Sequence, residues 1–261
     1  MIFLSKKGED TYINDFAKGC GAEPTSTDDF NYDDGDDSII LRGILKHDIM
    51  NQCRKDKRDF YYIDTGYFGN GRYKTWHRIV KNDLQHDKVI QRPDDRFRQF
   101  AKPINQWKKD GTKILVAAPD EKPCKHYGID RDEWIDATVK KIEKATDRPI
   151  EIRNRVSSRL GRLADPLEAA LADDVFALVT FNSVAATEAL FYGIPVFISA
   201  HGTKVTNAAA PLAYKDLRRI EKPKYADMDE RYAWACHLAY GQFHVSEMKD
   251  GSALDKLKDW F

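Results

Sequence analysis

The clearest pattern of hydrophobic and polar positions lies between residues 175 and 198. Val175–Phe181 is a continuous apolar run, which is typical of a strand buried on both faces. Ala185–Tyr192 consists mostly of helix-forming residues, and Gly193 followed by Pro195 is a helix-ending sequence. Val196–Ile198 begins another apolar run. The short connections predict a strand–helix–strand unit whose two strands are parallel neighbours.

The same alternation extends over most of the chain and predicts an α/β protein. The first part predicts strands at 2–4, 38–43 and 59–64, helices at 10–18 and 46–55, and a strand-like segment at 72–79. The second part predicts strands at 113–119 and 149–153 and helices at 132–145 and 166–171, and the tail from 227 to 261 predicts two packing helices. We therefore expect two small Rossmann-like, doubly wound domains at 1–108 and 109–222, followed by C-terminal helices at 223–261.

Composition and charge argue against several kinds of partner and segment. The 261 residues carry 42 basic and 42 acidic side chains, so no overall positive field indicates a nucleic-acid partner. The longest apolar runs are too short for a signal sequence or a membrane span, which predicts a cytoplasmic protein without a membrane partner. Four scattered cysteines and an acidic loop at 28–37 fit no metal-binding spacing, so we expect no metal.

Catalytic motifs of several large enzyme classes are missing from the sequence. It contains no G-x-S-x-G, no Walker A sequence and no complete G-x-G-x-x-G. These absences disfavour serine hydrolases, P-loop nucleotidases and nucleotide-dependent dehydrogenases.

Candidate site residues follow from the rule that open parallel sheets bind ligands at the carboxyl ends of their strands. In the first domain these ends carry polar, charged and loop residues, namely Arg42, Gly43, Asp64, Gly66 and Tyr67. In the second domain they carry Arg153, Arg155, Asn182, Ser183 and His201. Guanidinium groups such as those of Arg153 and Arg155 bind phosphates through paired hydrogen bonds, although a solvated surface is an equal interpretation.

Three residues of the sequence are candidates for a general base. Asp64 ends an apolar strand, where partial burial raises a carboxyl pKa toward use as a base. An Asx turn that stabilises the bend at Gly66 explains the same residue equally well. His77 and His201 are second choices, because isolated histidines more often have structural roles.

The start of the helix after residue 181 predicts an anion site. Its first backbone N–H groups, including that of Val184, together with the side chains of Asn182 and Ser183 suit phosphate oxygens. Glu188, one turn further on, suits the hydroxyl groups of a sugar. A capped helix in any parallel α/β protein gives the same pattern, so the motif alone does not decide the function.

These residues are nevertheless similar to the donor-binding segment of GT-B glycosyltransferases. The resemblance rests on the Asn182-Ser183 start followed by Glu188-Ala-Leu-x-x-Gly-x-Pro-Val196. It implies two domains facing across a cleft, a final helix that crosses back onto the first domain, and a nucleotide-diphosphate sugar as co-substrate without a further cofactor. Arg153 and the helix start would hold the diphosphate, and Glu188 the ribose.

A wider resemblance covers most of the chain from residue 38 onward. Segments 60–68, 146–153, 182–188 and 238–243 resemble short phage-encoded glycosyltransferases, some of which modify hydroxymethylated bases of DNA. This resemblance favours a hydroxymethylated pyrimidine in DNA as acceptor and a host-cytoplasm location, and the basic and aromatic residues at 72–78 agree with it. A capsule or lipopolysaccharide sugar transferase, a nucleotide-sugar epimerase and a non-catalytic nucleotide-binding module remain alternatives.

Overall fold

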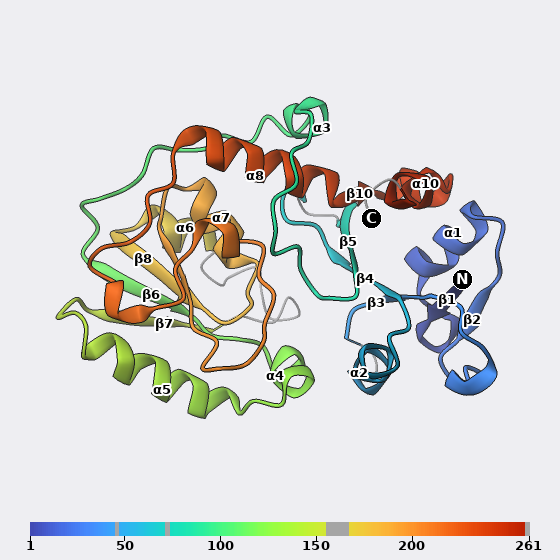
Figure 1. Ribbon diagram of the computed structural model, residues 1–261. Coiled ribbons are helices and arrows are strands. Elements are labelled where there is room, and N and C mark those ends of the chain that lie inside the picture. The colour runs from blue at the N-terminus through green and yellow to red at the C-terminus, as the bar shows by residue number, and fades with distance from the viewer. Residues whose placement is uncertain (45–46, 71–73, 155–166, 259–261) are drawn as a thin grey trace. The chain divides into compact units, whose positions relative to one another are not determined.

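The structure of the protein is a computed structural model that describes residues 1–44, 47–70, 74–154 and 167–258 (Figure 1). Arg155 and part of the basic and aromatic segment at 72–78 lie outside the described residues. The chain forms two compact units. Unit 1 comprises residues 1–84 and 239–261, and unit 2 comprises residues 85–238. The segment 85–108 thus belongs to unit 2, and the end of the chain belongs to unit 1.

Unit 1 is built on a mixed sheet with the strand order β10-β5-β4-β3-β1-β2. Strands β1 to β4 are parallel, whereas β5 is antiparallel to β4 and β10 is antiparallel to β5. The strands are β1 (Ile2–Ser5), β2 (Pro24–Ser26), β3 (Ile39–Arg42), β4 (Phe60–Thr65), β5 (Trp76–Lys81) and β10 (Gln242–His244). The three-residue strand β10 escapes sequence prediction, because it is too short to show alternation.

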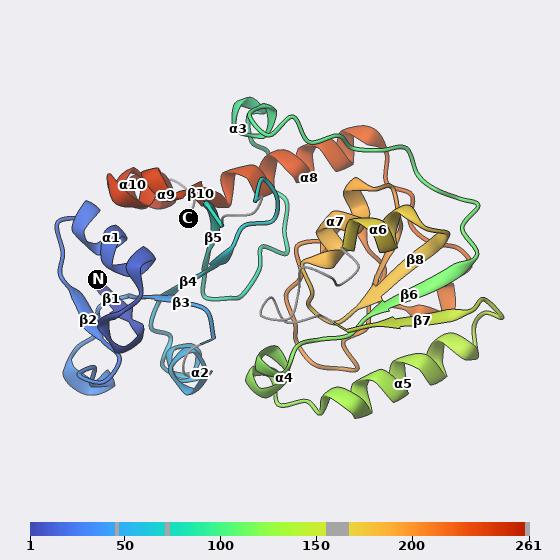
Figure 2. The same cartoon turned by 180° about the vertical axis from the view of Figure 1, so that it is seen from behind.

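Helices cover both faces of this sheet (Figures 1 and 2). On one face α1 (Thr11–Gly19), α9 (Val245–Lys249) and α10 (Ser252–Lys258) share a core with the alternate strand residues Ile40, Ile63 and Ile79. The other face carries α2 (His47–Asp56). Alternation along each strand therefore supplies two apolar faces, as a doubly wound sheet requires.

Unit 2 contains a fully parallel sheet with the order β7-β6-β8-β9. Its strands are β6 (Lys113–Ala117), β7 (Ile150–Arg153), β8 (Val175–Thr180) and β9 (Val196–Ile198). Figure 1 shows α5 (Arg131–Glu143) on one face and α6 (Leu167–Ala172) and α7 (Ala185–Phe191) on the other. Strand β8 is buried along its whole length, in agreement with the apolar run from which the strand was predicted.

The described residues of unit 2 form three further helices. They are α3 (Asp95–Arg98), α4 (Glu121–Tyr127) and α8 (Met228–Tyr240), whose last two residues belong to unit 1. Four short 3-10 turns complete the described secondary structure, at Lys6–Gly8, Tyr32–Asp34, Ala210–Leu212 and Leu217–Arg219. No helix in the described ranges combines the length and apolar character needed to cross a bilayer. The class predicted from the sequence, an α/β protein with Rossmann-like sheets, is confirmed.

The end of the chain is held in unit 1 by a very close backbone crossing. Gly251 has a φ of +78°, and a β-carbon added there would lie 2.3 Å from the carbonyl oxygen of Gly19 at the end of α1. Gly19 is equally confined, because its own added β-carbon would lie 2.5 Å from the carbonyl oxygen of Lys249. Only residues without a side chain allow α1 and the α9–α10 turn to approach this closely.

We expect Gly251→Ala to lower the free energy of unfolding by about 2–4 kcal/mol, because it combines a strained φ with an overpacked contact. Gly21→Ala is the matched control. Gly21 has a φ of +70°, but its added β-carbon meets nothing within 4 Å, so it tests the backbone strain alone. Chemical denaturation measures both variants, and equal losses of stability would show that the close crossing is unimportant.

Candidate functional site

The carboxyl edge of the unit 2 sheet brings several predicted residues together. Ala117 at the end of β6 is in register with Arg153 and Thr180, and Thr180 is in register with Ile198. Arg153, the Asn182–Ser183 turn and the segment after Ile198 therefore follow strands that end at the same edge. The Thr180 hydroxyl donates to the carbonyl oxygen of Ala117 at 3.0 Å and ties the two central strands together there.

The turn between β8 and α7 is ordered mainly by side chains. Thr180 Oγ1 accepts from the Ser183 N–H at 3.4 Å, and Ser183 Oγ accepts from the Ala185 N–H at 3.2 Å. The residue at the N-cap of α7 is Val184, which makes no side-chain cap bond, so Ser183 orders the turn just before the helix. Asn182 lies just before it and is mostly buried.

A glutamine that the sequence analysis did not single out fixes this turn. The Gln85 side chain is buried, and its amide nitrogen donates to the carbonyl oxygen of Asn182. Its amide oxygen accepts from the Ala208 N–H at 3.0 Å. Gln85 thereby joins the β8–α7 turn to the segment that follows β9. A polar residue in a charged linker gives no sequence signal for such a role.

Glu188 on α7 already has a charged partner. Lys102 Nζ lies 2.7 Å from Glu188 Oε2, and both side chains are about one-fifth exposed, at 22% and 21%. A ligand hydroxyl that reaches Glu188 therefore meets an ion pair, in which the second carboxylate oxygen has no bond among the described residues. Lys102 is a further residue that the sequence did not indicate.

His201 is held by polar groups of unit 2. Its Nε2 lies 2.8 Å from Thr138 Oγ1, and Lys141 Nζ lies 2.6 Å from its Nδ1. Because the ammonium group donates, Nδ1 accepts and Nε2 carries the proton. Burial and the neighbouring Lys141 cation both lower the pKa of His201, so the ring is neutral at pH 7. Because the His201 ring is neutral and both of its nitrogens are hydrogen-bonded, it contributes to the hydrogen-bond network at this edge of the sheet.

In unit 1, Asp64 is the second-last residue of β4 and forms a compact network. Its carboxylate accepts from Arg78 Nη2 at 3.0 Å, from the Tyr62 hydroxyl at 2.9 Å and from the Thr65 N–H at 2.7 Å. The Arg78 guanidinium is only 5% exposed, and it also donates to the carbonyl oxygens of Thr65 and Leu84. Arg78 thus anchors the edge instead of facing solvent. The available sequence signal was an arginine two residues after Trp76 and directly before the apolar pair Ile79-Val80.

The pKa of Asp64 reflects two opposed effects. Burial by itself raises the pKa of this carboxyl, but the Arg78 cation and the hydrogen bonds from Thr65 and Tyr62 outweigh burial and leave the pKa below its ordinary value. Asp64 is therefore ionised at neutral pH. Its role as a base stays a prediction, and the network adds a structural role in compensating Arg78.

His77 is completely buried on β5, beside Tyr12 with a ring-centroid distance of 4.4 Å. Burial, and secondly the Arg42 cation, lowers the pKa of His77 to about 4. A substrate does not reach a ring with no exposed surface in this arrangement.

The other predicted residues of unit 1 differ in accessibility. Arg42 Nε lies 2.8 Å from Asp10 Oδ2, and Gly43 has a φ of +69°. Gly66 donates to the carbonyl oxygen of Trp76, and a β-carbon there would lie 2.9 Å from Gln242 Oε1. Tyr67 is buried, and its N–H donates to the same Gln242 oxygen at 2.7 Å. Gly66 and Tyr67 thus shape the loop after β4, whereas Arg42 is partly accessible.

The described residues of the two sheet edges do not form a metal-binding cluster. In the described ranges, no three His, Cys, Asp or Glu side chains gather closely enough to hold a metal ion. The polar groups of both edges are amides, hydroxyls, guanidinium groups and paired carboxylates, which are suited to hydroxyl groups and anions.

Comparison with known proteins identifies the fold. At the sequence level no protein-family model and no curated protein matches the chain. Among solved structures, Thermosulfurimonas dismutans KpsC, named a beta Kdo 2,4 transferase, is similar with a TM-score of 0.52 and 11% identity over 90% of this chain and 89% of that one. A second KpsC structure of that organism, named a beta Kdo 2,7 transferase, is similar with a TM-score of 0.52 and 11% identity over 100% and 99% of the two chains. The chain therefore has a glycosyltransferase-like fold.

The Asp64–Arg78 network predicts a pH-dependent stability difference. At pH 7 we expect Asp64→Asn to lower the free energy of unfolding by roughly 2 kcal/mol, because Arg78 loses its charged acceptor. A lowered folded-state pKa stabilises the fold above the unfolded-state value near ~4, and this contribution is lost as the pH falls through the folded-state pKa. The difference in the free energy of unfolding between wild type and Asp64→Asn should therefore become smaller below pH ~4.

Urea unfolding at pH 7 and at lower pH measures this gap. Asp29→Asn is the control, because Asp29 is an exposed acidic residue of the same unit without a side-chain contact among the described residues. A gap that stays constant with pH would contradict the proposed ionic contribution of Asp64.

Proposed function

We propose that the protein is a glycosyltransferase that moves a sugar from a nucleotide-activated donor to an acceptor hydroxyl group. The observation that carries the proposal is the likeness to sugar transferases along the entire chain, which includes both units. The sequence supports it independently, because the Glu188 motif follows a strand and opens on an ordered helix start.

The donor is proposed to bind at the carboxyl edge of unit 2. We expect a nucleotide-diphosphate sugar, with Arg153 and Arg155 directed to the diphosphate and the Asn182–Val184 turn completing the phosphate site. Glu188 is proposed to hold the ribose through the carboxylate oxygen that Lys102 leaves open. His201 would donate from Nε2 only after exchanging its bond to Thr138, so we assign it a supporting role.

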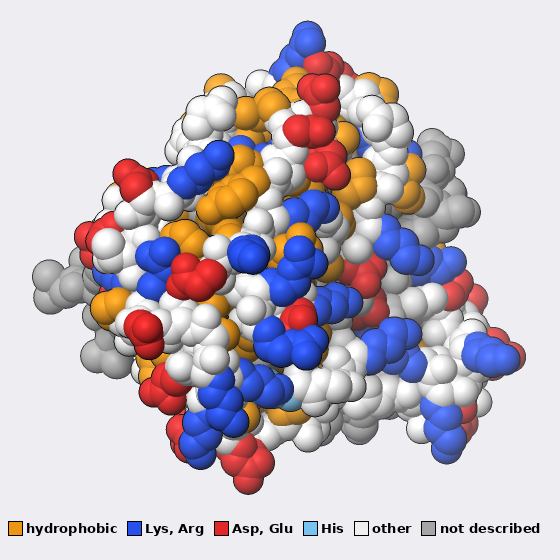
Figure 3. All heavy atoms as spheres, turned by 60° about the vertical axis from the view of Figure 1, so that its left-hand side comes forward, with side chains coloured by type: hydrophobic (Ala, Val, Ile, Leu, Met, Phe, Trp, Pro, Cys, Tyr) orange, Lys and Arg blue, Asp and Glu red, His pale blue; other side chains and the backbone are white. Residues whose placement is uncertain are grey.

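The acceptor is proposed to be a saccharide. The similar structures are named beta Kdo 2,4 and beta Kdo 2,7 transferases, which agrees with this choice. A DNA acceptor with a hydroxymethylated pyrimidine has less support, because Arg78 of the basic segment 72–78 is buried against Asp64. Figure 3 shows Lys and Arg side chains on one face together with Asp, Glu and hydrophobic side chains.

Asp64 remains the proposed base for the acceptor hydroxyl. It lies at the carboxyl edge of unit 1 and is ionised at neutral pH, as a base must be. Its lowered pKa makes it a weak base, so its contribution would come from position more than from proton affinity.

Transfer assays with the full chain test this function. Radiolabelled uridine, guanosine and cytidine nucleotide sugars are offered with an oligosaccharide panel, with hydroxymethylated DNA, with unmodified DNA and alone. Label in an oligosaccharide supports the proposal, and label only in hydroxymethylated DNA moves the acceptor to DNA. Epimerised donor without transfer indicates an epimerase. A chain that neither binds nor converts any donor is not a glycosyltransferase.

A variant of Glu188 tests the donor site. We expect Glu188→Gln to raise the Kd of the nucleotide donor by about 10-fold or more, because a charged acceptor of the ribose hydroxyls is lost. Calorimetric titration measures the change. Glu143→Gln, which alters an exposed glutamate of α5, is the control and should leave the Kd unchanged. Equal Kd values for wild type and Glu188→Gln would remove Glu188 from the donor site.

A further inference from the structure

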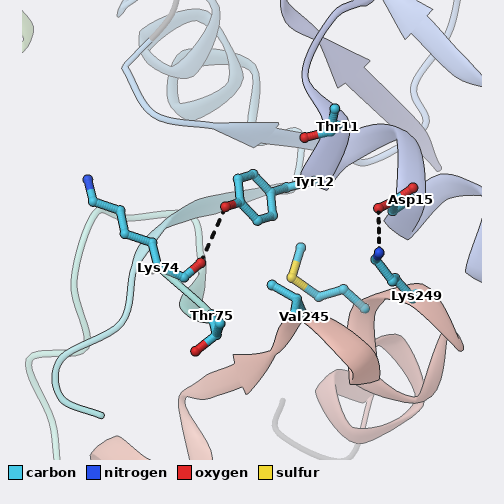
Figure 4. Close-up of a pocket in the computed structure, with 8 residues that line it drawn as sticks. Thr11, Tyr12, Asp15, Lys74, Thr75, Val245 and Lys249 are labelled. Carbon is cyan, nitrogen blue, oxygen red and sulfur yellow. Dashed lines mark hydrogen bonds and ion pairs between the residues drawn. The ribbon is translucent and has the colours of Figure 1, made fainter. Parts of the chain in front are cut away.

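Unit 1 contains a pocket that none of the predicted site residues lines. It has a volume of about 330 Å³ and lies between α1, the start of β5 and α9 (Figure 4). Tyr12, Val245 and Met248 provide apolar surface, and Asp15, Thr75 and Lys249 provide polar groups. Its volume is at the lower end of the range for small-molecule pockets, which suits a single small ligand.

The pocket lies at the edge where ligands of parallel sheets bind. Helix α1 follows the carboxyl end of β1 after the 3-10 turn Lys6–Gly8, and its capping residue Asp10 is bonded to Arg42 at the end of β3. Thr75 precedes β5, and β5 begins beside the end of β4 because Thr65 is in register with His77. The strand ends of unit 1 therefore converge on the elements that form the pocket.

The walls of the pocket are held in place by hydrogen bonds between lining residues and by a contact with Arg42. The Tyr12 hydroxyl donates to the carbonyl oxygen of Lys74 at 3.3 Å, and the Arg42 guanidinium lies 4.8 Å from the centroid of the Tyr12 ring. The Val245 N–H donates to the carbonyl oxygen of Thr75 at 2.9 Å, which joins α9 to the start of β5. The pocket is thus preformed, and binding would require little ordering of its walls.

Its polar groups remain available to a ligand. Asp15 and Lys249 form an ion pair at 3.2 Å, with side chains that are 41% and 62% exposed. Figure 4 shows this pair at one side of the pocket and Thr75 at the other, with Tyr12 and Val245 between them. Hydroxyl and charged groups at the rim of an apolar floor match a sugar ring, which has an apolar C–H face and polar hydroxyl edges.

We propose that this pocket binds the terminal sugar of the acceptor saccharide. The C–H face of the sugar packs on Val245, Met248 and Tyr12, and its hydroxyl groups bond to Thr75 and to the Asp15–Lys249 pair. The inference rests on the proposed glycosyltransferase function and adds the acceptor subsite, which lies in unit 1 and is formed in part by the C-terminal helix α9.

Filling the pocket tests the inference. We expect Val245→Phe to raise the KM for the acceptor saccharide by about 10-fold or more, while the KM for the donor changes far less, because the lost contacts are made with the acceptor alone. The matched control is Val89→Phe, which makes the same change at a 38% exposed valine of unit 2. Thr75→Val is a milder second variant that removes one hydroxyl group and should raise the acceptor KM several-fold.

Direct binding separates this inference from the function on which it rests. Saturation-transfer NMR with the acceptor oligosaccharide and the full chain should show contacts to the terminal sugar that Val245→Phe removes and Val89→Phe retains. If wild type transfers sugar but both pocket variants remain folded with an unchanged acceptor KM, the pocket inference is wrong and the function stands. If wild type converts no donor, the proposed glycosyltransferase function is wrong. If in addition Val245→Phe leaves the NMR signal of the saccharide unchanged, the inference that this pocket binds a sugar is wrong as well.

Discussion

Two buried glutamines hold the turns that follow the strands β4 and β8, and the arrangement of both sheet edges depends on them. Gln242 Oε1 accepts from the N–H groups of Tyr67 and Phe68, and its Nε2 donates to the carbonyl oxygen of Phe68. Gln85 bonds in the same way to Asn182 and Ala208. Buried turns need partners for backbone groups that no strand satisfies, and a primary amide supplies both a donor and an acceptor. Each glutamine thereby fixes an irregular segment at a ligand-binding edge.

Several charged residues at these edges form ion pairs. Arg42 binds Asp10, Arg78 binds Asp64, and Lys102 binds Glu188. Pairing restrains the side chains in one geometry and leaves little net charge, which agrees with the equal numbers of acidic and basic residues. A ligand at such an edge meets oriented hydrogen-bonding groups instead of a strong field. That character suits the hydroxyl groups of sugars, whose recognition depends on direction more than on charge.

The segment 242–251 contributes both to the sheet of unit 1 and to its pocket. Strand β10 extends the sheet beside β5, and α9 packs against α1 through the Gly19–Gly251 crossing. The same helix contributes Val245 and Lys249 to the pocket in Figure 4. Residues 242–251 therefore both complete the sheet of unit 1 and form one wall of its candidate subsite. Variants in this segment affect stability and binding together, so the controls must separate the two.

The sequence by itself determined the α/β class, the buried strand β8, the helix α7 with its Gly193 ending, and the strand ends at which Arg153, Asn182 and Asp64 lie. These features follow from local periodicity and from capping residues, which act within a few positions along the chain. The tertiary structure alone decided that Gln242 and Gln85 support the turns, that Arg78 anchors Asp64, and that β10 joins β5. It also decided that Tyr12 and Val245, more than 200 residues apart, line one pocket. Such contacts depend on which distant segments the fold brings together, and no local pattern encodes their partners.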